Sequence, residues 1–410
     1  MKILQVNNVY KRGSTGKITY EIHKELLSKG LRSVVCYGRG IILDEPNVYK
    51  TCGEIYSKLN HLISNFTGIV YGGNFLSTYR LISIIKKEKP DIVHLQCING
   101  YFVNIYKLIE WLKSNKIKTV LTLHAEFMYT GGCSYSINCE KWKNLNGCKK
   151  CPNYRREFHS YFDRSHTMWK KMKNAFEGFD NDLVIVSVSP WLMNRAQQSS
   201  ILSNKTHCMI LNGVDTSIFY RRSETSIKKI KDKFGIVDSK IVLHVTPNFN
   251  DDLKHIKGGY FVIKLAEQNP DITFVVVGPK IGDFDIPKNI ISIGSIDNQN
   301  MLAILYSMAN ITLLTSKRET FSMIVAESLC CGTPIIGFKA GAPEQITIND
   351  YSSFVETENI NELNKELRRW VKKEFDRNEI CYRSRKKYSN RYMCNNYINV
   401  YEEMLNGKKM

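Results

Sequence analysis

Residues 319–337 read ETFSMIVAESLCCGTPIIG, and this stretch decides the fold class. Apolar side chains recur at helical spacing from Phe321 to Cys331, which predicts a helix there. Gly332 stands where a C-cap glycine belongs, and Pro334–Gly337 is a short apolar run typical of a buried strand. A loop, a helix, a turn and a strand in this order indicate one unit of an α/β sheet.

The same stretch carries two carboxylates separated by seven residues. We expect Glu319 in the loop just before the helix and Glu327 about two turns into it. Carboxylates accept hydrogen bonds from sugar hydroxyls, and the amides of a helix N-terminus bind phosphate. An isolated pair of this kind is more often a solvated helix face, so the assignment depends on other segments of the chain.

Short apolar runs alternate with helical patterns along the whole sequence. A polar segment, residues 221–233, separates two such arrays and predicts a linker followed by a helix. We therefore expect two Rossmann-like α/β domains with parallel sheets and a cleft between them. The expected strands are Ile3–Val6, Ser33–Tyr37, Asp91–Leu95, Val120–Leu123, Leu183–Val188, Cys208–Leu211, Ile241–Thr246, Thr273–Val277, Ile290–Ile293, Ile311–Leu314 and Pro334–Gly337, with helices at Ile18–Ser28 and Arg383–Leu405.

Composition narrows the class of protein. A chain of 410 residues with 43% hydrophobic and 24% charged residues suits two soluble domains. The formal charge of +19 fits nucleic acid, an anionic membrane surface or a phosphorylated substrate. We expect no signal peptide and no membrane span, because Gln5, Asn7 and Asn8 interrupt the apolar start and no apolar run reaches about 18 residues. These features predict a cytoplasmic protein.

Four of the twelve cysteines lie within 19 residues, in a stretch without strong periodicity. The spacing C-x5-C-x8-C-x2-C ends in the C-x-x-C bite that grips a tetrahedral metal. The cysteine-rich stretch therefore predicts a structural zinc site, with free or disulfide-linked thiols left open as alternatives. The candidate ligands are Cys133, Cys139, Cys148 and Cys151.

Two glycine-bearing turns each precede a predicted helix. Gly13 and Gly16 flank the turn after the first strand, but Lys11 and Ile18 stand where a P-loop needs glycine and Ser or Thr. Lys257 and Gly258 follow the first strand of the second half. Both turns can bring backbone amides close to an anion, and both also read as ordinary tight turns.

The E-x7-E stretch resembles the signature of the family 4 retaining glycosyltransferases, which have the GT-B fold. The GSTG turn, the Lys257-Gly258 pair, the segment NGVD at 212–215 and the turn GAPE at 341–344 resemble further motifs of that family. The resemblance implies an acceptor-binding domain at 1–217 with a cysteine-rich insertion at about 125–160. It also implies a nucleotide-sugar-binding domain at 218–382, and a terminal helix at 383–410 that packs back on the first domain.

The resemblance also implies roles for single residues. Glu327 would bind the ribose hydroxyls, Glu319 the hexose hydroxyls and Lys257 the diphosphate. Lys254 would replace an arginine that the family carries, and His124 would lie next to the donor sugar, which makes Glu319 and His124 the catalytic candidates. The remaining donor-binding candidates are Gly13, Gly16, Gly258, Phe321, Ser322 and Met323. No catalytic metal is implied.

The expected activity is transfer of a hexose-type sugar from a UDP- or GDP-linked donor to a lipid-linked or saccharide acceptor in surface polysaccharide synthesis. Another GT-B enzyme, such as a sugar-nucleotide 2-epimerase, and a basic zinc-containing nucleic-acid-binding protein stay open, although no nucleic-acid motif appears. The basic surplus predicts peripheral contact with the inner, anionic face of the cell membrane. The basic candidates are Lys107, Lys113, Lys116, Lys118, Arg155 and Arg156.

Overall fold

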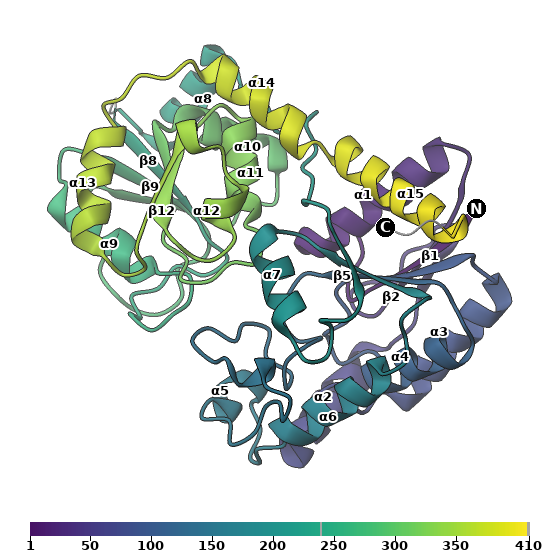
Figure 1. Cartoon of the computed structure of the whole chain (residues 1–410). Coiled ribbons are helices and arrows are strands. Elements are labelled where there is room, and N and C mark those ends of the chain that lie inside the picture. Colours follow the sequence, from purple (N-terminus) through teal and green to yellow (C-terminus); the bar gives the residue numbers. More distant parts are fainter. Residues whose placement is uncertain (238–239, 408–410) are drawn as a thin grey trace. The chain divides into compact units, whose positions relative to one another are not determined.

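The computed structural model describes residues 1–237 and 240–407. The chain divides into two compact units (Figure 1). Unit 1 consists of Met1–Leu211 with Cys394–Met410, and unit 2 is Asn212–Met393. Within the described part of the chain, none of the helices combines the length and the apolar character that a bilayer span requires.

Unit 1 is built on a parallel sheet in the order β3-β2-β1-β4-β5-β6-β7. Its central strands are fully buried and rich in valine, isoleucine and leucine, as expected for a sheet covered on both faces. The strands are β1 Lys2–Asn7, β2 Arg32–Tyr37, β3 Val48–Lys50, β4 Ile92–Leu95, β5 Thr119–Leu123, β6 Leu183–Ser187 and β7 Thr206–Met209.

Helices cover both faces of this sheet. Figure 1 shows α1 and α15 on one face and α3, α4 and α6 on the other. The helices are α1 Gly13–Ser28, α2 Glu54–Thr67, α3 Phe75–Glu88, α4 Ile105–Ser114, α5 Tyr154–Phe158, α6 Ser165–Phe176, α7 Pro190–Gln198 and α15 Asn390–Leu405, with a 3₁₀ turn η1 at Lys141–Lys143.

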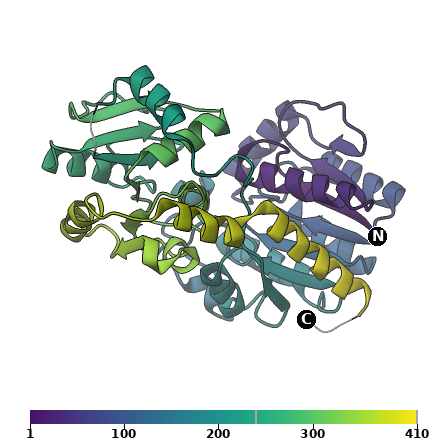
Figure 2. The same ribbon diagram turned by 90° about the horizontal axis from the view of Figure 1, so that it is seen from above.

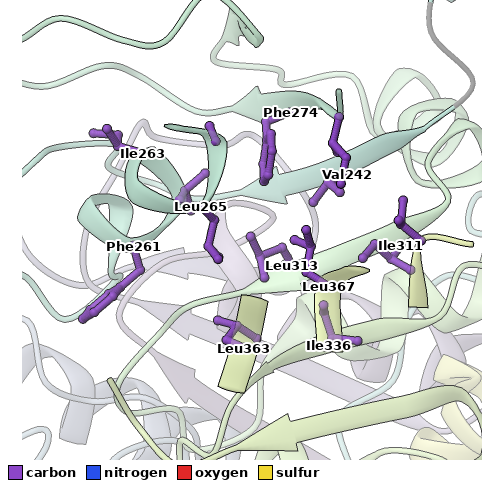
Figure 3. Close-up of a cluster of buried hydrophobic side chains, with 14 of the residues drawn as sticks. Val242, Phe261, Ile263, Leu265, Phe274, Ile311, Leu313, Ile336, Leu363 and Leu367 are labelled. Atoms are coloured by element: carbon purple, nitrogen blue, oxygen red, sulfur yellow. The ribbon is translucent and has the colours of Figure 1, made fainter. Parts of the chain in front are cut away.

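Unit 2 repeats the design with a parallel six-stranded sheet in the order β10-β9-β8-β11-β12-β13. Side chains from its strands interlock with those of α9 and α13 in one buried cluster, part of which is shown in Figure 3. The elements are β8 Ile241–Val245, β9 Thr273–Val277, β10 Ile290–Gly294, β11 Ile311–Leu314, β12 Ile335–Phe338, β13 Ser352–Val355, α8 Glu224–Phe234, α9 Gly259–Gln268, α10 Gln299–Met308, α11 Met323–Cys330, α12 Pro343–Ile346, η2 Asn349–Tyr351, α13 Ile360–Trp370 and α14 Arg377–Tyr388.

The prediction of one continuous helix over Arg383–Leu405 is wrong. Two helices, α14 and α15, meet at Ser389, whose ψ of 138° is extended. Figure 2 shows them as two successive helices near the yellow, C-terminal end of the chain. Val214 causes the break: its N–H donates to the Tyr388 carbonyl at 2.8 Å, and its carbonyl accepts from the Asn390 N–H at 2.9 Å. This short parallel bridge takes the place of helical hydrogen bonds, so the chain leaves the helix for one residue and then starts another.

Candidate functional site

The strand order of unit 2 defines where a ligand is expected. The chain runs from β8 outward to β9 and β10, and from β11 outward to β12 and β13, so the two directions diverge between β8 and β11. In open parallel sheets, ligands bind at the carboxyl ends of the strands at this switch point. The loops after β8 and β11 carry the Lys257 and Glu319 candidates.

Lys257 and Glu319 form an ion pair across this switch point. The Lys257 Nζ donates to Glu319 Oε1 at 2.6 Å, and the two side chains are 23% and 11% exposed. Gly258 makes this approach feasible: its φ is +67°, and a Cβ there would lie 2.2 Å from the Thr315 carbonyl oxygen. The Thr315 hydroxyl in turn donates to the Lys257 carbonyl at 3.2 Å. Glycine is therefore required so that the lysine loop can pack against the end of β11.

The turn after β12 fixes the backbone around Glu319. The Glu319 N–H donates to the Ala340 carbonyl at 2.9 Å, and the Ala342 N–H donates to the Glu319 carbonyl at 3.2 Å. The Glu344 carboxylate accepts from the N–H groups of Ala340 and Gly341, each at 3.0 Å. The GAPE segment therefore acts through its own backbone and the Glu344 carboxylate, which hold the Glu319 loop in place.

Helix α11 begins at Met323, two residues later than the sequence suggested. Ser322, the residue before α11, has φ 79° and ψ 94°. These angles are not helical, and they are strained for a residue with a side chain. The Ser322 hydroxyl is buried and has no hydrogen-bond partner among residues 1–237 and 240–407. At the other end Gly332 has φ 79°, as expected for the residue after a helix C-cap. Within the first turn, the Val325 N–H donates to the Ser322 carbonyl at 3.2 Å. The N–H groups of Met323 and Ile324 precede any intrahelical acceptor and can donate to an anion.

Glu327 lies just over one turn into α11, because the helix starts later than expected. Its Oε2 accepts a hydrogen bond from the Tyr306 hydroxyl at 3.0 Å. Burial, reinforced by the Glu327 charge, raises the pKa of Tyr306 well above its ordinary value, so the hydroxyl keeps its proton and remains a donor. Tyr306 is a site residue that the sequence did not reveal, since nothing in α10 distinguishes it from a core tyrosine.

Two further side chains belong to the β8 region. Lys254 is exposed in the loop three residues before Lys257. His244 is buried in β8, and its Nδ1 lies 3.0 Å from the Leu313 carbonyl of β11. Desolvation lowers the pKa of His244 to about 4, so its imidazole is neutral near pH 7. His244 therefore joins the two strands that flank the switch point.

In unit 1 the glycine turn departs from the expected form. Helix α1 begins at Gly13, so both Gly13 and Gly16 lie in its first turns, and the bend falls on the residues before them. Lys11 has φ 62°, and its N–H donates to the Gly16 carbonyl at 3.1 Å. A Cβ on Gly16 would lie 3.1 Å from a methyl carbon of Val9. The small residues thus allow close packing of the turn on α1.

The two strand-end histidines of unit 1 have different surroundings. His94 is buried, with Nδ1 2.7 Å from the Tyr401 hydroxyl and Nε2 2.8 Å from the Thr122 hydroxyl, so it helps to attach α15. His124 Nε2 lies 2.9 Å from Gln96 Oε1. Desolvation lowers the pKa of His124 to about 4. At neutral pH it is therefore an uncharged imidazole, which suits hydrogen bonding to a ligand better than proton donation.

The four clustered cysteines line one small cavity of about 20 Å³. A hydrogen bond with the Cys133 thiol lowers the pKa of Cys151 to about 7, and the Cys148 sulfur accepts from the Gly131 N–H at 3.2 Å. However, no three His, Cys, Asp or Glu side chains in residues 1–237 and 240–407 are arranged to hold a metal ion. The thiols thus share a cavity without forming a complete ligand set, and the zinc site stays a prediction.

A buried ion pair anchors the cysteine-rich loop. The Glu126 carboxylate is fully buried and meets Arg195 of α7, with Nε to Oε1 at 2.6 Å. It also accepts from the Ser136 N–H at 2.6 Å and from the Tyr129 hydroxyl at 3.1 Å. The Arg195 guanidinium lies 4.7 Å from the centroid of the Trp142 ring. This network ties the first part of the loop, from Glu126 to Trp142, to α7.

Several known proteins that are similar to this chain are described as glycosyl transferases. Residues 226–387, most of unit 2, match the family model described as glycosyl transferases group 1. This match spans less than half of the chain and supports, for unit 2, the glycosyltransferase family expected from the sequence. It is 23% identical over 427 residues to the putative colanic acid biosynthesis glycosyl transferase WcaC of Escherichia coli K12, covering 98% of this chain and all of WcaC.

Two other proteins are similar to this chain. It is 25% identical over 282 residues to N-acetyl-alpha-D-glucosaminyl L-malate synthase of Bacillus anthracis, covering 66% of this chain and 62% of that enzyme. The structure of Anabaena HepE in complex with UDP and glucose superimposes with a TM-score of 0.66 at 13% identity, covering 98% of this chain and all of HepE. The expectation of a GT-B glycosyltransferase fold is confirmed.

Proposed function

We propose that this glycosyltransferase moves a hexose-type sugar from a UDP- or GDP-linked donor to a lipid-linked or saccharide acceptor during surface polysaccharide synthesis. The observation that carries the proposal is the Lys257–Glu319 ion pair at the switch point of unit 2, next to the N-terminus of α11. It puts a cation, helix amides and a carboxylate where a diphosphate and a sugar would lie side by side.

The residues of unit 2 divide between the parts of a nucleotide sugar. Lys257 and the first-turn amides of α11 would bind the diphosphate, and Glu319 would accept hydrogen bonds from the sugar hydroxyls. Glu327, held by Tyr306, would accept from the ribose hydroxyls. Lys254 supplies a second exposed positive charge in the same loop. For His124, whose imidazole is neutral at pH 7, the expected role near the donor sugar rests on the family resemblance alone.

The proposed reaction retains the anomeric configuration. The bond from the anomeric carbon to the diphosphate breaks, and the acceptor oxygen bonds to that carbon on the same face. The acceptor proton passes to the leaving phosphate oxygen, so no enzyme nucleophile is needed. Lys257 and the α11 amides would stabilise the negative charge that develops on the leaving diphosphate.

Names of relatives support the pathway and the donor class. WcaC is described as a colanic acid biosynthesis glycosyl transferase, and HepE has been crystallised with UDP-glucose. Colanic acid is a polysaccharide, which favours a saccharide or lipid-linked acceptor for this chain. The nucleotide bound by HepE favours a uridine nucleotide as the first donor to test.

The test is a thermal-shift screen of UDP- and GDP-sugars, followed by calorimetry with the best ligand. Mass spectrometry with saccharide and lipid-linked acceptors would identify the product, and NMR would give its anomeric configuration. Lys257→Gln should abolish the thermal shift, whereas Lys264→Gln, an exposed lysine of α9 paired with Glu267, should preserve it. Epimerised or hydrolysed donor without acceptor-dependent product would overturn the transferase proposal.

A further inference from the structure

Helix α2 of unit 1 turns its polar side toward the protein interior and its apolar side toward solvent. The residues it buries are polar, namely Ser57, Asn60 and Ser64. Its large apolar side chains point to solvent, with Ile55 85% and Phe66 58% exposed. An amphipathic helix on a soluble domain normally buries its apolar side. The opposite orientation of α2 therefore needs a physical cause, and an exposed apolar surface of this kind usually marks an interaction site.

Hydrogen bonds of the buried polar side chains fix this orientation. Asn60 Oδ1 accepts from the Asn74 N–H at 2.8 Å, which secures the start of α3. The Ser57 hydroxyl donates to the Gly100 carbonyl at 3.1 Å. A Cβ on Gly73 would lie 2.4 Å from Asn60 Oδ1, so the packing around Asn60 is tight. Turning α2 to bury its apolar side would leave these groups unpaired, which is unfavourable for buried polar atoms.

The exposed apolar side of α2 continues onto neighbouring segments. In the first turn of α3, Leu76 is 73% exposed, and its N–H donates to the Tyr56 hydroxyl of α2 at 3.3 Å. At the end of α2, the Phe66 ring lies 5.5 Å from that of Tyr161. We call this surface the apolar face; its exposed members are Ile55, Leu59, Leu62, Ile63, Phe66, Phe75, Leu76, Tyr79, Tyr161 and Phe162. Figure 1 shows that α2 and α3 belong to the helical layer opposite α1 and α15.

Positive charge borders the apolar face. Lys58 and Arg80 are exposed on α2 and α3, and the Lys107 Nζ lies 5.1 Å from the centroid of the exposed Phe75 ring. Beside them a hollow of about 360 Å³ is lined by residues of α2, α4 and α6, including Lys107 and Lys171. Of the nearby carboxylates, Glu54 is paired with Arg39 at 2.8 Å, while Glu110 lines the hollow.

We propose that the apolar face inserts into the interfacial region of an anionic lipid bilayer. Leucine, isoleucine and phenylalanine would enter the acyl boundary, with tyrosines at the headgroup level. Lys58 and Lys107 would extend to anionic headgroups, since lysine stems lie along apolar surface while the ammonium stays solvated. A second copy of this chain fits less well, because a two-fold contact through this face would bring its lysines together.

This surface differs from the electrostatic docking that the charge alone suggested. Two of the lysines considered for that role are engaged elsewhere in the protein. Lys113 donates to the Glu177 carbonyl at 2.8 Å, and Lys118 donates to the Met404 carbonyl. Lys107 is the member of that set that adjoins the apolar face. Binding driven by insertion should therefore resist salt, whereas binding through surface charge alone would be screened.

The test is flotation of the full chain with phosphatidylcholine vesicles, with and without added phosphatidylglycerol, at low and high salt. No donor or acceptor is present, so the result is independent of the proposed transferase activity. Leu59→Gln with Phe66→Gln should lower vesicle partitioning about tenfold or more. A matched control, Val237→Gln with Tyr382→Gln, removes side chains that are 91% and 67% exposed in unit 2 and should partition like the unchanged protein.

Each outcome decides the proposal. Binding to phosphatidylglycerol vesicles that persists in part at high salt and falls only in the Leu59/Phe66 variant would support insertion. Absence of flotation, or equal flotation of both double variants, would overturn it. A dimer in light scattering that the Leu59/Phe66 variant turns into monomer, without vesicle binding, would assign the face to self-association instead. Thermal melts of both variants confirm folding, which these exposed positions should not affect.

Discussion

Replacing Glu319 with glutamine should separate nucleotide binding from turnover. The Lys257 ammonium and the Glu319 carboxylate are 2.6 Å apart, so a donor diphosphate that binds Lys257 would compete with Glu319 for it. Glutamine keeps the size and shape of the side chain but removes its charge. The variant therefore releases Lys257 for the diphosphate while weakening the grip on the sugar hydroxyls.

The magnitude follows from the contact itself. A hydrogen bond between charged groups contributes about 1.5–3 kcal/mol, and partial exposure of the pair, 23% and 11%, reduces this toward about 1 kcal/mol. We expect Glu319→Gln to bind the nucleoside diphosphate as tightly as the unchanged protein or up to about tenfold more tightly. Its kcat should fall by about tenfold or more, because a charged acceptor at the sugar is lost.

A double-mutant cycle measured by calorimetry provides the check. Lys257→Met should weaken nucleoside diphosphate binding by about tenfold to a hundredfold, and adding Glu319→Gln should then change little, because the competition has already been removed. Lys264→Gln serves as the charge-matched control outside the site. Clearly weaker diphosphate binding by Glu319→Gln, with a normal melting temperature, would refute the competition between Glu319 and the diphosphate.

Four further outcomes are expected. Glu327→Ala should weaken nucleotide binding by about tenfold or more, and Tyr306→Phe should do so to a smaller extent, as calorimetry would show; unchanged affinity of the Glu327 variant would remove it from the ribose site. Arg195→Met should destabilise the protein by about 3–5 kcal/mol in chemical denaturation, because it leaves a buried carboxylate unpaired; a loss below about 1 kcal/mol would contradict this role. Elemental analysis of protein purified without chelator should find about one zinc per chain, which Cys148→Ser should lower; fully active, metal-free protein would end the zinc prediction. Burial lowers the pKa of His94 to about 3, whereas in the unfolded chain it is about 6.5. As the pH falls from about 6.5 toward 3, the unfolded state binds a proton that the folded state does not bind, so the free energy of unfolding decreases. Denaturation at pH 7 and pH 5 should therefore differ less in His94→Gln than in the unchanged protein.

The sheets were predictable because their strands are buried on both faces. Apolar runs such as Thr273–Val277 and Ile311–Leu314 coincide with β9 and β11. A short continuous apolar run is typical of a parallel strand that is covered on both faces. The missed strands, β3 and β13, lie at sheet edges. β3 has three residues and β13 is largely half-buried, so neither carries an apolar run that a pattern search could find.

The candidate site was predictable in its residues but not in its contacts. Spacing and resemblance selected Lys257 and Glu319, which are 62 positions apart in sequence. Their pairing depends on the neighbouring placement of β8 and β11, which only the sheet order reveals. The strain at Ser322 was also hidden, because serine is ordinarily a good residue before a helix. Its backbone angles result from the tertiary packing of the loop and not from local preference.

Helix α2 shows a limit of a different kind. A periodic pattern states which side chains share a helix face, but the decision about which face turns inward rests on tertiary contacts. In α2 the Asn60 side chain makes that decision, because it accepts from the Asn74 backbone and donates to the Tyr56 carbonyl. The described residues, 1–237 and 240–407, leave the large apolar side chains of this stripe exposed. Since the polar contacts that hold it there are specific and buried, the exposed stripe is a built feature of unit 1, and this is the reason for proposing a lipid surface as its partner.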